Sequence, residues 1–170
     1  MATKENEEGR GIMKRIYLAG GCFWGMQRFL DGAEGVTKTE VGYANGRTDR
    51  PTYQEVKSQT TGYAETVKAD YDERVLPTER LVRRFLEVID PFAVNRQGED
   101  EGEQYRTGIY FENEEDRRIA EEEVRKVEEA SGRKCAVEVA PLSNYWTAEE
   151  YHQKYLEKHP NGYCHIFVKF

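Results

Sequence analysis

The chain has 170 residues, enough for one domain with a core of its own. Apolar residues make up 38% of it and charged residues 34%, a balance typical of a soluble globular protein. A net charge of −7 without a basic cluster disfavours binding to nucleic acid or to an anionic membrane. No run of about 18 apolar residues predicts a membrane span. No secretion signal is recognisable at the N-terminus, so a cytoplasmic protein is expected.

The first predicted elements follow a polar N-terminal stretch. Residues 1–13 offer nothing to bury and are expected to be a flexible tail, followed by one domain over residues 14–170. A strand is predicted at residues 15–19 and stops at two glycines. A helix at residues 22–30 follows at once, and Gly32 is its expected end.

Strands and helices alternate along the rest of the chain. Alternating patterns predict strands at residues 36–43, 64–71, 106–111 and 134–140, and a last apolar strand after Gly162. Helical spacing predicts helices at residues 78–89, from 113 through 127, and at 147–156, the last with a capping box. The polar loop at residues 91–105 is longer than a plain connection and is expected to be functional. These elements predict a mixed α/β fold with one sheet.

The three cysteines, Cys22, Cys135 and Cys164, are too few and too scattered for the disulfide framework of a secreted protein. No two of them form a CxxC, and no two histidines have the spacing of zinc ligands, so no metal site is expected. Each cysteine is therefore a nucleophile, a member of a redox pair, or an inert buried residue.

Cys22 carries the strongest chemical signal. It follows Gly20 and Gly21 at the predicted start of a helix, where unpaired backbone N–H groups and the helix dipole favour a thiolate. Phe23 and Trp24 stand next to it and are typical of a pocket wall, although core packing also uses such aromatics. The alternative for Cys22 is burial as a small apolar residue at a strand–helix junction.

Several short motifs occur along the chain in a consistent order. They are Gly21-Cys22-Phe23-Trp24-Gly25, Gly42-Tyr43-Ala44-Asn45-Gly46, Pro51-Thr52-Tyr53, Thr61-Gly62-Tyr63-Ala64-Glu65, Asn95-Arg96-Gln97-Gly98 with Asp100, Gly102, Gln104, Tyr105 and Arg106, Tyr151-His152-Gln153, and Gly162-Tyr163-Cys164. The series resembles the signature of the A-type peptide methionine sulfoxide reductases. This resemblance covers most of the chain, from residue 21 to residue 164.

The resemblance implies a two-layer α/β sandwich around a ferredoxin-like split βαβ core with a mixed sheet, in a single catalytic domain over residues 14–170. It implies an oxidoreductase for protein repair under oxidative stress, which reduces methionine S-sulfoxide, free or in proteins. Thioredoxin is the expected partner that recycles the enzyme, with dithiothreitol as a laboratory substitute. No metal, flavin or nicotinamide cofactor is expected, and the expected state is a monomer.

The same resemblance assigns roles to the matching residues. Cys22 would attack the sulfoxide sulfur and become a sulfenic acid, which Cys164 would resolve as a disulfide. Glu65 would donate a proton and therefore needs a desolvated, neutral carboxyl group; an exposed strand glutamate is the alternative. Tyr53 and Tyr105 would hydrogen-bond the sulfoxide oxygen, and half-buried packing is the alternative for each.

Three more residues would contact or orient the substrate. By the resemblance, Phe23 and Trp24 would enclose the methyl group on sulfur, and Asp100 would orient the substrate or Tyr105. Cys135 lies outside the motifs, and its alternation with two valines favours burial in the sheet.

The sequence departs from the family pattern at three motif positions. Tyr63 replaces the histidine of TGHAE, which raises the question of what supports Glu65 and its pKa. Gln27 stands where glutamate is common, and Asn45 replaces a frequent glycine. None of these changes removes a residue that the chemistry requires.

Two other functions are compatible with a reactive Cys22. One is a thiol peroxidase that uses Cys22 and Cys164 against hydroperoxides, and the other is a non-enzymatic module that holds methionine-like side chains. His152 and His159 are interpreted as structural. His165 is adjacent to Cys164 and could raise the thiolate fraction of that residue.

Overall fold

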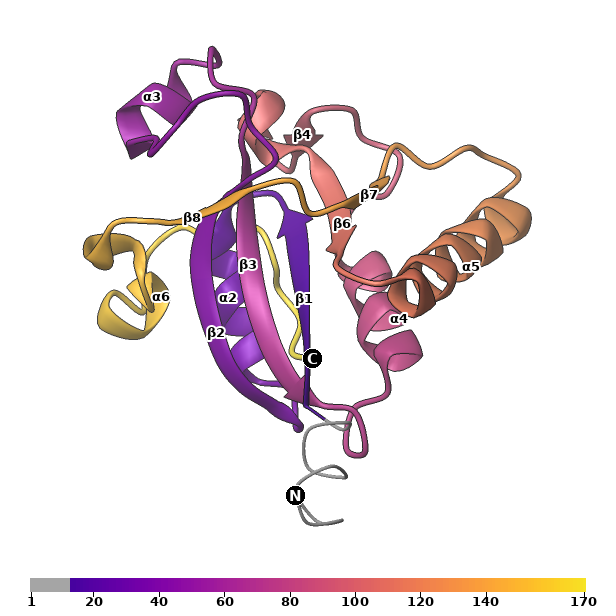
Figure 1. Ribbon diagram of the computed structural model, residues 1–170. Helices are drawn as coiled ribbons and strands as arrows, with labels where there is room; N and C mark the ends of the chain where they lie inside the picture. The colour runs from indigo at the N-terminus through magenta and orange to yellow at the C-terminus, as the bar shows by residue number, and fades with distance from the viewer. Residues whose placement is uncertain (1–12) are drawn as a thin grey trace, which may run out of the picture.

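A mixed six-stranded sheet forms the centre of the molecule (Figure 1). The computed structural model describes residues 13–170. The expected N-terminal tail lies outside the described residues, apart from Met13, which is already the first residue of a strand. The strands of the sheet are β1 (Met13–Gly20), β2 (Val36–Ala44), β3 (Ala64–Asp72), β6 (Thr107–Phe111), β7 (Glu138–Pro141) and β8 (Tyr145–Thr147). A separate hairpin pairs β4 (Arg96–Gln97) with β5 (Asp100–Glu101).

The strand order in the sheet is β7-β6-β1-β3-β2-β8. All neighbouring strands pair antiparallel except β6 and β7, which are parallel. The unit β1-α2-β2 therefore encloses β3 between its strands, and the unit β3-α4-β6 encloses β1, where α2 is Phe23–Asp31 and α4 is Thr78–Val88. These interlocked units are the ferredoxin-like split βαβ core, so the predicted fold class is confirmed.

The main helices pack on one face of the sheet, which gives the expected two layers (Figure 1). Helices α2, α4 and α5 (Glu114–Ser131) share a single buried core with the strands. Its members include Ile16, Leu18, Phe23, Met26, Val67, Leu81, Phe85 and Ala120. Shorter helical pieces are α3 (Tyr53–Lys57), η1 (Glu103–Tyr105), η2 (Glu150–His152) and α6 (Tyr155–Lys158). No helix within residues 13–170 is long and apolar enough to cross a bilayer.

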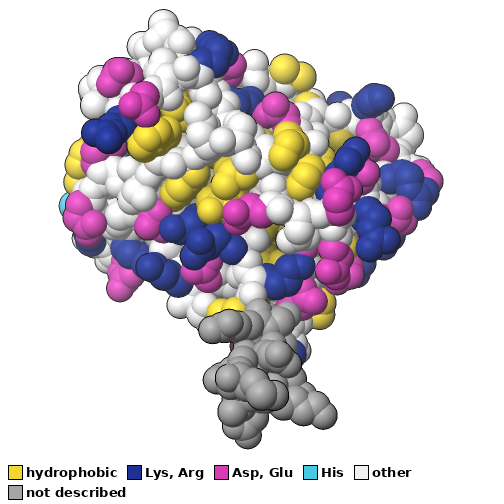
Figure 2. Space-filling model, viewed as in Figure 1, with side chains coloured by type: hydrophobic (Ala, Val, Ile, Leu, Met, Phe, Trp, Pro, Cys, Tyr) yellow, Lys and Arg dark blue, Asp and Glu magenta, His cyan; other side chains and the backbone are white. Residues whose placement is uncertain are grey.

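The opposite face of the sheet carries a smaller aromatic cluster. Tyr17 and Tyr110 are buried there, and the ring of Tyr145 from β8 lies 5.1 Å from that of Tyr17. Figure 2 shows hydrophobic side chains gathered along the middle of one face, with charged side chains of both signs around them. In Figure 1, drawn from the same side, α2 lies behind the sheet. Cys22, which is the N-cap of α2, therefore belongs to the helical side of the sheet.

Two predicted elements near the C-terminus are wrong. Thr147 pairs with Gly42 at the end of β8, and its hydroxyl donates to Glu40, so the predicted capping box does not form. The short pieces η2 and α6 replace the predicted helix at residues 147–156. Residues 162–170 form no strand but pack beside α2, where the Phe170 ring lies 5.1 Å from Phe29. Ile166 is buried in this packing without strand pairing, whereas Phe167 and Val168 remain exposed.

Candidate active site

The junction between β1 and α2 has the backbone conformation that the Gly-Gly-Cys sequence predicts. Gly21 adopts a φ of +83°, which glycine takes without strain, and Cys22 is the N-cap of α2. A Cβ on Gly21 would lie 2.6 Å from the Cβ of Gln97, so the glycine also lets the β4-β5 hairpin approach. The backbone N–H groups of Trp24 and Gly25 lie close enough to the Cys22 sulfur to lower its pKa, although the side chain makes no capping hydrogen bond.

The Cys22 side chain is nearly buried, with 7% of the residue exposed. Burial, and then the adjacent Glu65 carboxyl group, raise the pKa of the Cys22 thiol well above its usual value. The N–H groups of the helix N-terminus lower it by less. The prediction that Cys22 is a thiolate is therefore wrong for the enzyme without substrate. Desolvation of the Cys22 sulfur outweighs the contribution of the helix N-terminus to its pKa.

Glu65 is buried on the helical side of β3. The pairing of β1 with β3 places Leu18 opposite Val67, so Glu65, two residues earlier and on the same face, lies beside the start of α2. Only 2% of Glu65 is exposed. Its Oε1 accepts a hydrogen bond from the Phe23 N–H at 3.3 Å, and its Oε2 accepts one from the Gln104 side chain at 2.5 Å.

The surroundings of Glu65 keep its carboxyl group protonated. Burial raises the pKa of Glu65 to about 8, against the hydrogen bonds from Gln104 and Phe23, and the nearby Asp100 adds to the increase. The neutral acid therefore predominates at pH 7. Each oxygen already accepts a hydrogen bond from a fixed donor, so the acidic proton occupies a remaining lone pair. Glu65 is a buried acid and not an exposed strand carboxylate.

Gln104 is a site residue that sequence reasoning did not single out. It is 2% exposed, and its Oε1 accepts a hydrogen bond from Gln59 Nε2 at 2.6 Å. The Gln59 Oε1 in turn accepts the Glu103 N–H at 2.6 Å. This chain of amides orients the Gln104 NH₂ group toward Glu65. Gln104 belongs to the motif around Asp100 given above, but the motif does not reveal that its side chain contacts Glu65.

Tyr63, which stands in place of the family histidine, has a different environment. Its hydroxyl donates to the backbone carbonyl of Thr48 and accepts from Asn144 at 3.4 Å. None of its hydrogen bonds within the described residues reaches Glu65. The substitution therefore leaves the support of Glu65 to Gln104 and the backbone of α2.

Tyr53 and Tyr105 come from separate elements and meet near Cys22. Thr52 closes a capping box that makes Tyr53 the first residue of α3, and Tyr105 ends η1. The two side chains lie close enough for each to affect the pKa of the other. Burial, followed by the proximity of Glu65, raises the pKa of Tyr53 to about 12 and that of Tyr105 further. Both phenols are therefore proton donors at neutral pH.

Aromatic residues pack around His152 beside the cysteine. The Phe23 ring lies 5.1 Å from the imidazole, and the Tyr53 ring lies 4.6 Å from it. Trp24 donates its indole N–H to His152 Nδ1 at 3.0 Å and stacks on Tyr155 at 3.8 Å. His152 is 1% exposed and so holds the indole as part of the site wall. The sequence indicated a structural histidine but not this contact with Trp24.

Asp100 contacts the C-terminal segment, which we define as residues 162–170. Its carboxyl group lies close to the His165 ring and to the Tyr163 side chain. Burial raises the pKa of Asp100, and the proximity of His165 and of Tyr163 opposes the increase. Asp100 thus joins the β4-β5 hairpin to the segment that carries Cys164.

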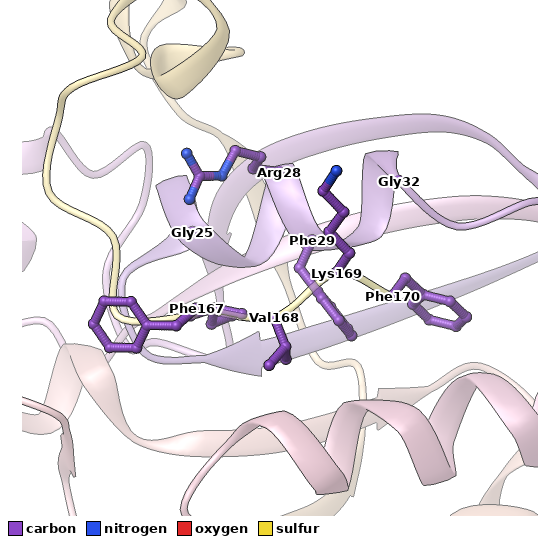
Figure 3. A pocket seen from close by; sticks show the side chains of 9 residues that line it. Gly25, Arg28, Phe29, Gly32, Phe167, Val168, Lys169 and Phe170 are labelled. Carbon is purple, nitrogen blue, oxygen red and sulfur yellow. The ribbon is translucent and has the colours of Figure 1, made fainter.

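Cys164 reaches the first turn of α2 from the far end of the chain. A Cβ on Gly25 would lie 3.0 Å from the Cys164 sulfur, so this sulfur sits directly over Gly25. Farther along α2, a cleft of about 640 Å³ opens beside the C-terminal segment (Figure 3). Its lining residues are Gly25, Arg28, Phe29, Gly32, Ile166, Phe167, Val168, Lys169 and Phe170. Cys22 does not line this cleft, but its sulfur lies near the backbone N–H of Gly25, which lowers its pKa.

Cys135 lies in another part of the molecule. It precedes β7 and is half-buried, and its backbone N–H donates to the Glu128 side chain at 2.9 Å. The prediction that it is buried in the sheet is wrong, because the parallel pairing of β7 with β6 begins only at Glu138.

The site therefore combines one sulfur nucleophile with several proton donors. A thiol, a neutral carboxylic acid and two phenols surround the start of α2. This combination suits attack by sulfur on a centre whose oxygen must gain a proton as it is removed. Within residues 13–170, no three His, Cys, Asp or Glu side chains form a group that could hold a metal ion.

Known proteins with the same sequence pattern and fold agree with this chemistry. The family model described as "Peptide methionine sulfoxide reductase" matches residues 14–170. The "Peptide methionine sulfoxide reductase MsrA" of Clostridium acetobutylicum is 51% identical over 154 residues, which cover 91% of this chain and 95% of the relative.

Two crystal structures of Mxr1 from Saccharomyces cerevisiae share the fold. The reduced form matches with a TM-score of 0.88 and 31% identity, covering 94% of each chain. The complex with Trx2 matches with a TM-score of 0.64 and 21% identity, covering 94% of this chain and 92% of the other. The findings do not favour the peroxidase or the non-enzymatic binding module. The chain belongs to the peptide methionine sulfoxide reductase family and is an oxidoreductase that uses thiol chemistry to reduce methionine sulfoxide.

Proposed function

We propose that the enzyme acts on the S epimer of methionine sulfoxide, free or within proteins, with Cys22 as the nucleophile. The Cys22 sulfur attacks the sulfoxide sulfur, and the oxygen is transferred to Cys22. The products are methionine and the sulfenic acid Cys22–S–OH. The thiol loses two electrons and the sulfoxide gains two, so no other cofactor takes part in this step.

The neutral carboxyl group of Glu65 beside the Cys22 sulfur is the observation that carries this proposal. With a pKa of about 8, Glu65 holds a transferable proton at neutral pH for the sulfoxide oxygen. Tyr53 and Tyr105 supply two more O–H groups that stabilise the charge developing on that oxygen.

The selectivity for one epimer follows from two fixed positions around the sulfur. We assign the methyl group to the apolar wall of Phe23 and Trp24, and the oxygen to the side of Glu65 and the two tyrosines. With both groups held in place, only one configuration presents the sulfur to Cys22. The Trp24 indole donates a hydrogen bond to His152 at 3.0 Å, and this bond supports a fixed position of the Trp24 side chain in the wall.

The test is incubation with dithiothreitol and each separated epimer of N-acetylmethionine sulfoxide. We expect only the S epimer to be consumed. Equal loss of both epimers would contradict the assigned wall. Consumption of hydroperoxide without sulfoxide turnover would favour the peroxidase, and unaltered sulfoxide after long incubation would favour the binding module.

Recycling is proposed to use Cys164 and a thioredoxin. Cys164 attacks the Cys22 sulfenic acid, a disulfide forms, and water leaves; thioredoxin then reduces the disulfide by exchange. The position of both cysteines against Gly25 supports the pairing, and the crystal structure of yeast Mxr1 with Trx2 supports the partner. Because one chain supplies every proposed group, we propose a monomer.

Peptide mapping of enzyme treated with excess sulfoxide and no reductant tests the pairing. A peptide that links Cys22 with Cys164 is expected. A link between Cys22 and Cys135 would show that the resolving cysteine has been assigned to the wrong residue.

A further inference from the structure

We propose that His165 is the base that removes the proton from Cys164 when the disulfide with Cys22 forms. The inference rests on the proposed function, in which Cys164 resolves the sulfenic acid. It assigns to His165 the second chemical step and not the reduction of the sulfoxide.

The tautomer of His165 is set by the backbone of the strand–helix junction. His165 Nε2 lies 2.7 Å from the carbonyl oxygen of Gly20. A carbonyl oxygen only accepts hydrogen bonds, so Nε2 carries a hydrogen. Burial lowers the pKa of His165, which favours the neutral ring. In the neutral ring Nδ1 then has a lone pair and no hydrogen, which is the form that a base requires.

The free nitrogen and the Cys164 sulfur both face the side of Gly25 that lacks a side chain. A Cβ on Gly25 would be 3.0 Å from Cys164 Sγ and 3.1 Å from His165 Nδ1. His165 Nδ1 is buried and has no hydrogen-bond partner within the described residues. The Cys164 thiol at present donates to the Ile166 carbonyl at 3.2 Å, and rotation about its Cβ–Sγ bond redirects the S–H. Transfer to Nδ1 then proceeds directly or through one water molecule.

The Cys22 sulfur also lies near Gly25. The backbone N–H of Gly25 is close enough to lower the pKa of Cys22, and Cys164 and His165 lie over the position where Gly25 lacks a side chain. The electrophile, the attacking thiol and the base therefore all adjoin one glycine. This arrangement provides the proximity that an intramolecular displacement needs.

The step balances without any further reactant. His165 Nδ1 takes the proton of Cys164, and the thiolate attacks the sulfur of Cys22–S–OH. A sulfur–sulfur bond forms and the sulfur–oxygen bond breaks. The hydroxide leaves with the proton from the imidazolium, so the products are a disulfide, water and neutral His165. The sulfenic sulfur is reduced and the Cys164 sulfur is oxidised.

Asp100 is the charged group that faces the imidazole. Its carboxyl group, from the β4-β5 hairpin, lies close enough to His165 for each to affect the pKa of the other. One of its oxygens, Oδ2, is buried without a hydrogen-bond partner within the described residues. A carboxylate there stabilises the imidazolium that forms during the step. The Gly20 carbonyl thus orients the base, and Asp100 supplies the nearby negative charge.

The experiment uses the full chain with His165→Gln, because the glutamine amide can still donate to the Gly20 carbonyl but cannot act as a base. Enzyme and an equal amount of methionine sulfoxide are mixed without reductant and quenched over time. Methionine, dimedone-trapped sulfenic acid and the Cys22–Cys164 peptide are measured separately. We expect methionine to form at the wild-type rate and the disulfide to form about 10²-fold more slowly at pH 7, the lower end for base catalysis. Sulfenic acid should accumulate in between.

The dependence on pH separates a base from a structural support. Without a base, Cys164 must ionise alone, so the deficit of His165→Gln should shrink as the pH rises toward the pKa of a free thiol. A deficit of the same size at every pH would overturn the inference, as would an unchanged rate of disulfide formation. The exposed His159, changed to Gln, is the matched control and should behave as wild type. Failure of the wild-type enzyme to release methionine would instead contradict the proposed function.

Discussion

Glu65 and Glu149 show how the surroundings of a residue set its protonation in this site. Burial dominates at Glu65 and raises its pKa to about 8. At Glu149 burial acts in the same direction, but hydrogen bonds from the Tyr53 N–H at 2.9 Å and the Tyr43 hydroxyl at 2.7 Å outweigh it and lower the pKa. Glu149 is therefore an anion that anchors Tyr53, whereas Glu65 is a neutral acid.

Replacement of Glu65 by Gln tests its role as acid. The amide keeps the shape but has no transferable proton, so the single-turnover rate should fall by about 10²-fold while substrate affinity changes far less. The wild-type rate should also decline as the pH rises through about 8, because Glu65 then loses its proton. The variant should lack this decline. Glu79→Gln, at an exposed position on α4, is the control, and equal rates for both variants would return Glu65 to a structural role.

Gly25→Ala tests the close approach of the two cysteines. The new Cβ would lie 3.0 Å from the Cys164 sulfur, so the C-terminal segment must shift, although alanine favours the helix by about 1 kcal/mol. The required shift is a few tenths of an ångström, so the loss in rate should be below the roughly 10²-fold that a misplacement of about 1 Å costs. We expect slower disulfide formation in quenched single turnovers, with the fold retained. Gly32→Ala, where the nearest contact is an ordinary 3.5 Å, should form the disulfide normally. If Gly25→Ala forms the disulfide as fast as Gly32→Ala, the Cys164 sulfur does not need the space over Gly25.

At the scale of elements, the C-terminal segment differs from the rest of the structure because no backbone ladder holds it. His165 binds the Gly20 carbonyl at 2.7 Å, and Arg84 of α4 donates to the Lys169 carbonyl at 2.5 Å. Phe170 adds an aromatic contact with Phe29 on α2. A segment held by a few separate contacts opens at lower free energy than a paired strand. This suits an element that must present Cys164 first to Cys22 and then, as a disulfide, to a partner.

Cysteine replacements test the division of labour between this segment and α2. Cys164→Ser should release about one methionine per enzyme without reductant and then fail to turn over with thioredoxin, because no disulfide is available for exchange. A small thiol should restore turnover by reaching the sulfenic acid directly. Cys135→Ser is the matched control and should turn over normally with thioredoxin. Cys22→Ser should give no methionine, and sustained thioredoxin-dependent turnover by Cys164→Ser would contradict the scheme.

At the scale of the whole molecule, the sheet brings the site together from distant parts of the chain. Glu65 comes from β3, Cys22 from the start of α2, Tyr53 from α3, Tyr105 from η1, and Cys164 from the C-terminal segment. Glu65 is a buried ionisable acid among these residues. Its protonation therefore affects both the chemistry of the site and the stability of the fold.

The free energy of unfolding should therefore depend on pH through Glu65. Its pKa is 4.5 when unperturbed and about 8 in the folded protein, so the stabilising effect of its protonation is fully present below pH 4.5 and is lost as the pH rises through 8. The loss for the single group is on the order of a few kcal/mol. Urea unfolding at pH 5, 7 and 9 should show a smaller decline for Glu65→Gln than for wild type. Parallel declines would mean that Glu65 is charged in the folded protein.

Local patterns in the sequence were sufficient for the central elements. The Gly-Gly turn before Cys22 predicted the start of α2, and alternating residues predicted β2 and β3, because these preferences act over a single turn or a few strand residues. They failed for Cys135 and for Thr147, where strand pairing with a distant partner decided the conformation.

The sequence by itself determined the family and the chemical types of the site residues, because these are properties of the side chains and of their order. Only the tertiary structure decided their protonation and orientation. Cys22 is a thiol and Glu65 a neutral acid because folding removes both from water. The contact of Gln104 with Glu65, and that of Cys164 with Gly25, join segments far apart in the chain. Desolvation and long-range contacts arise only when the chain folds, so no local pattern contains them.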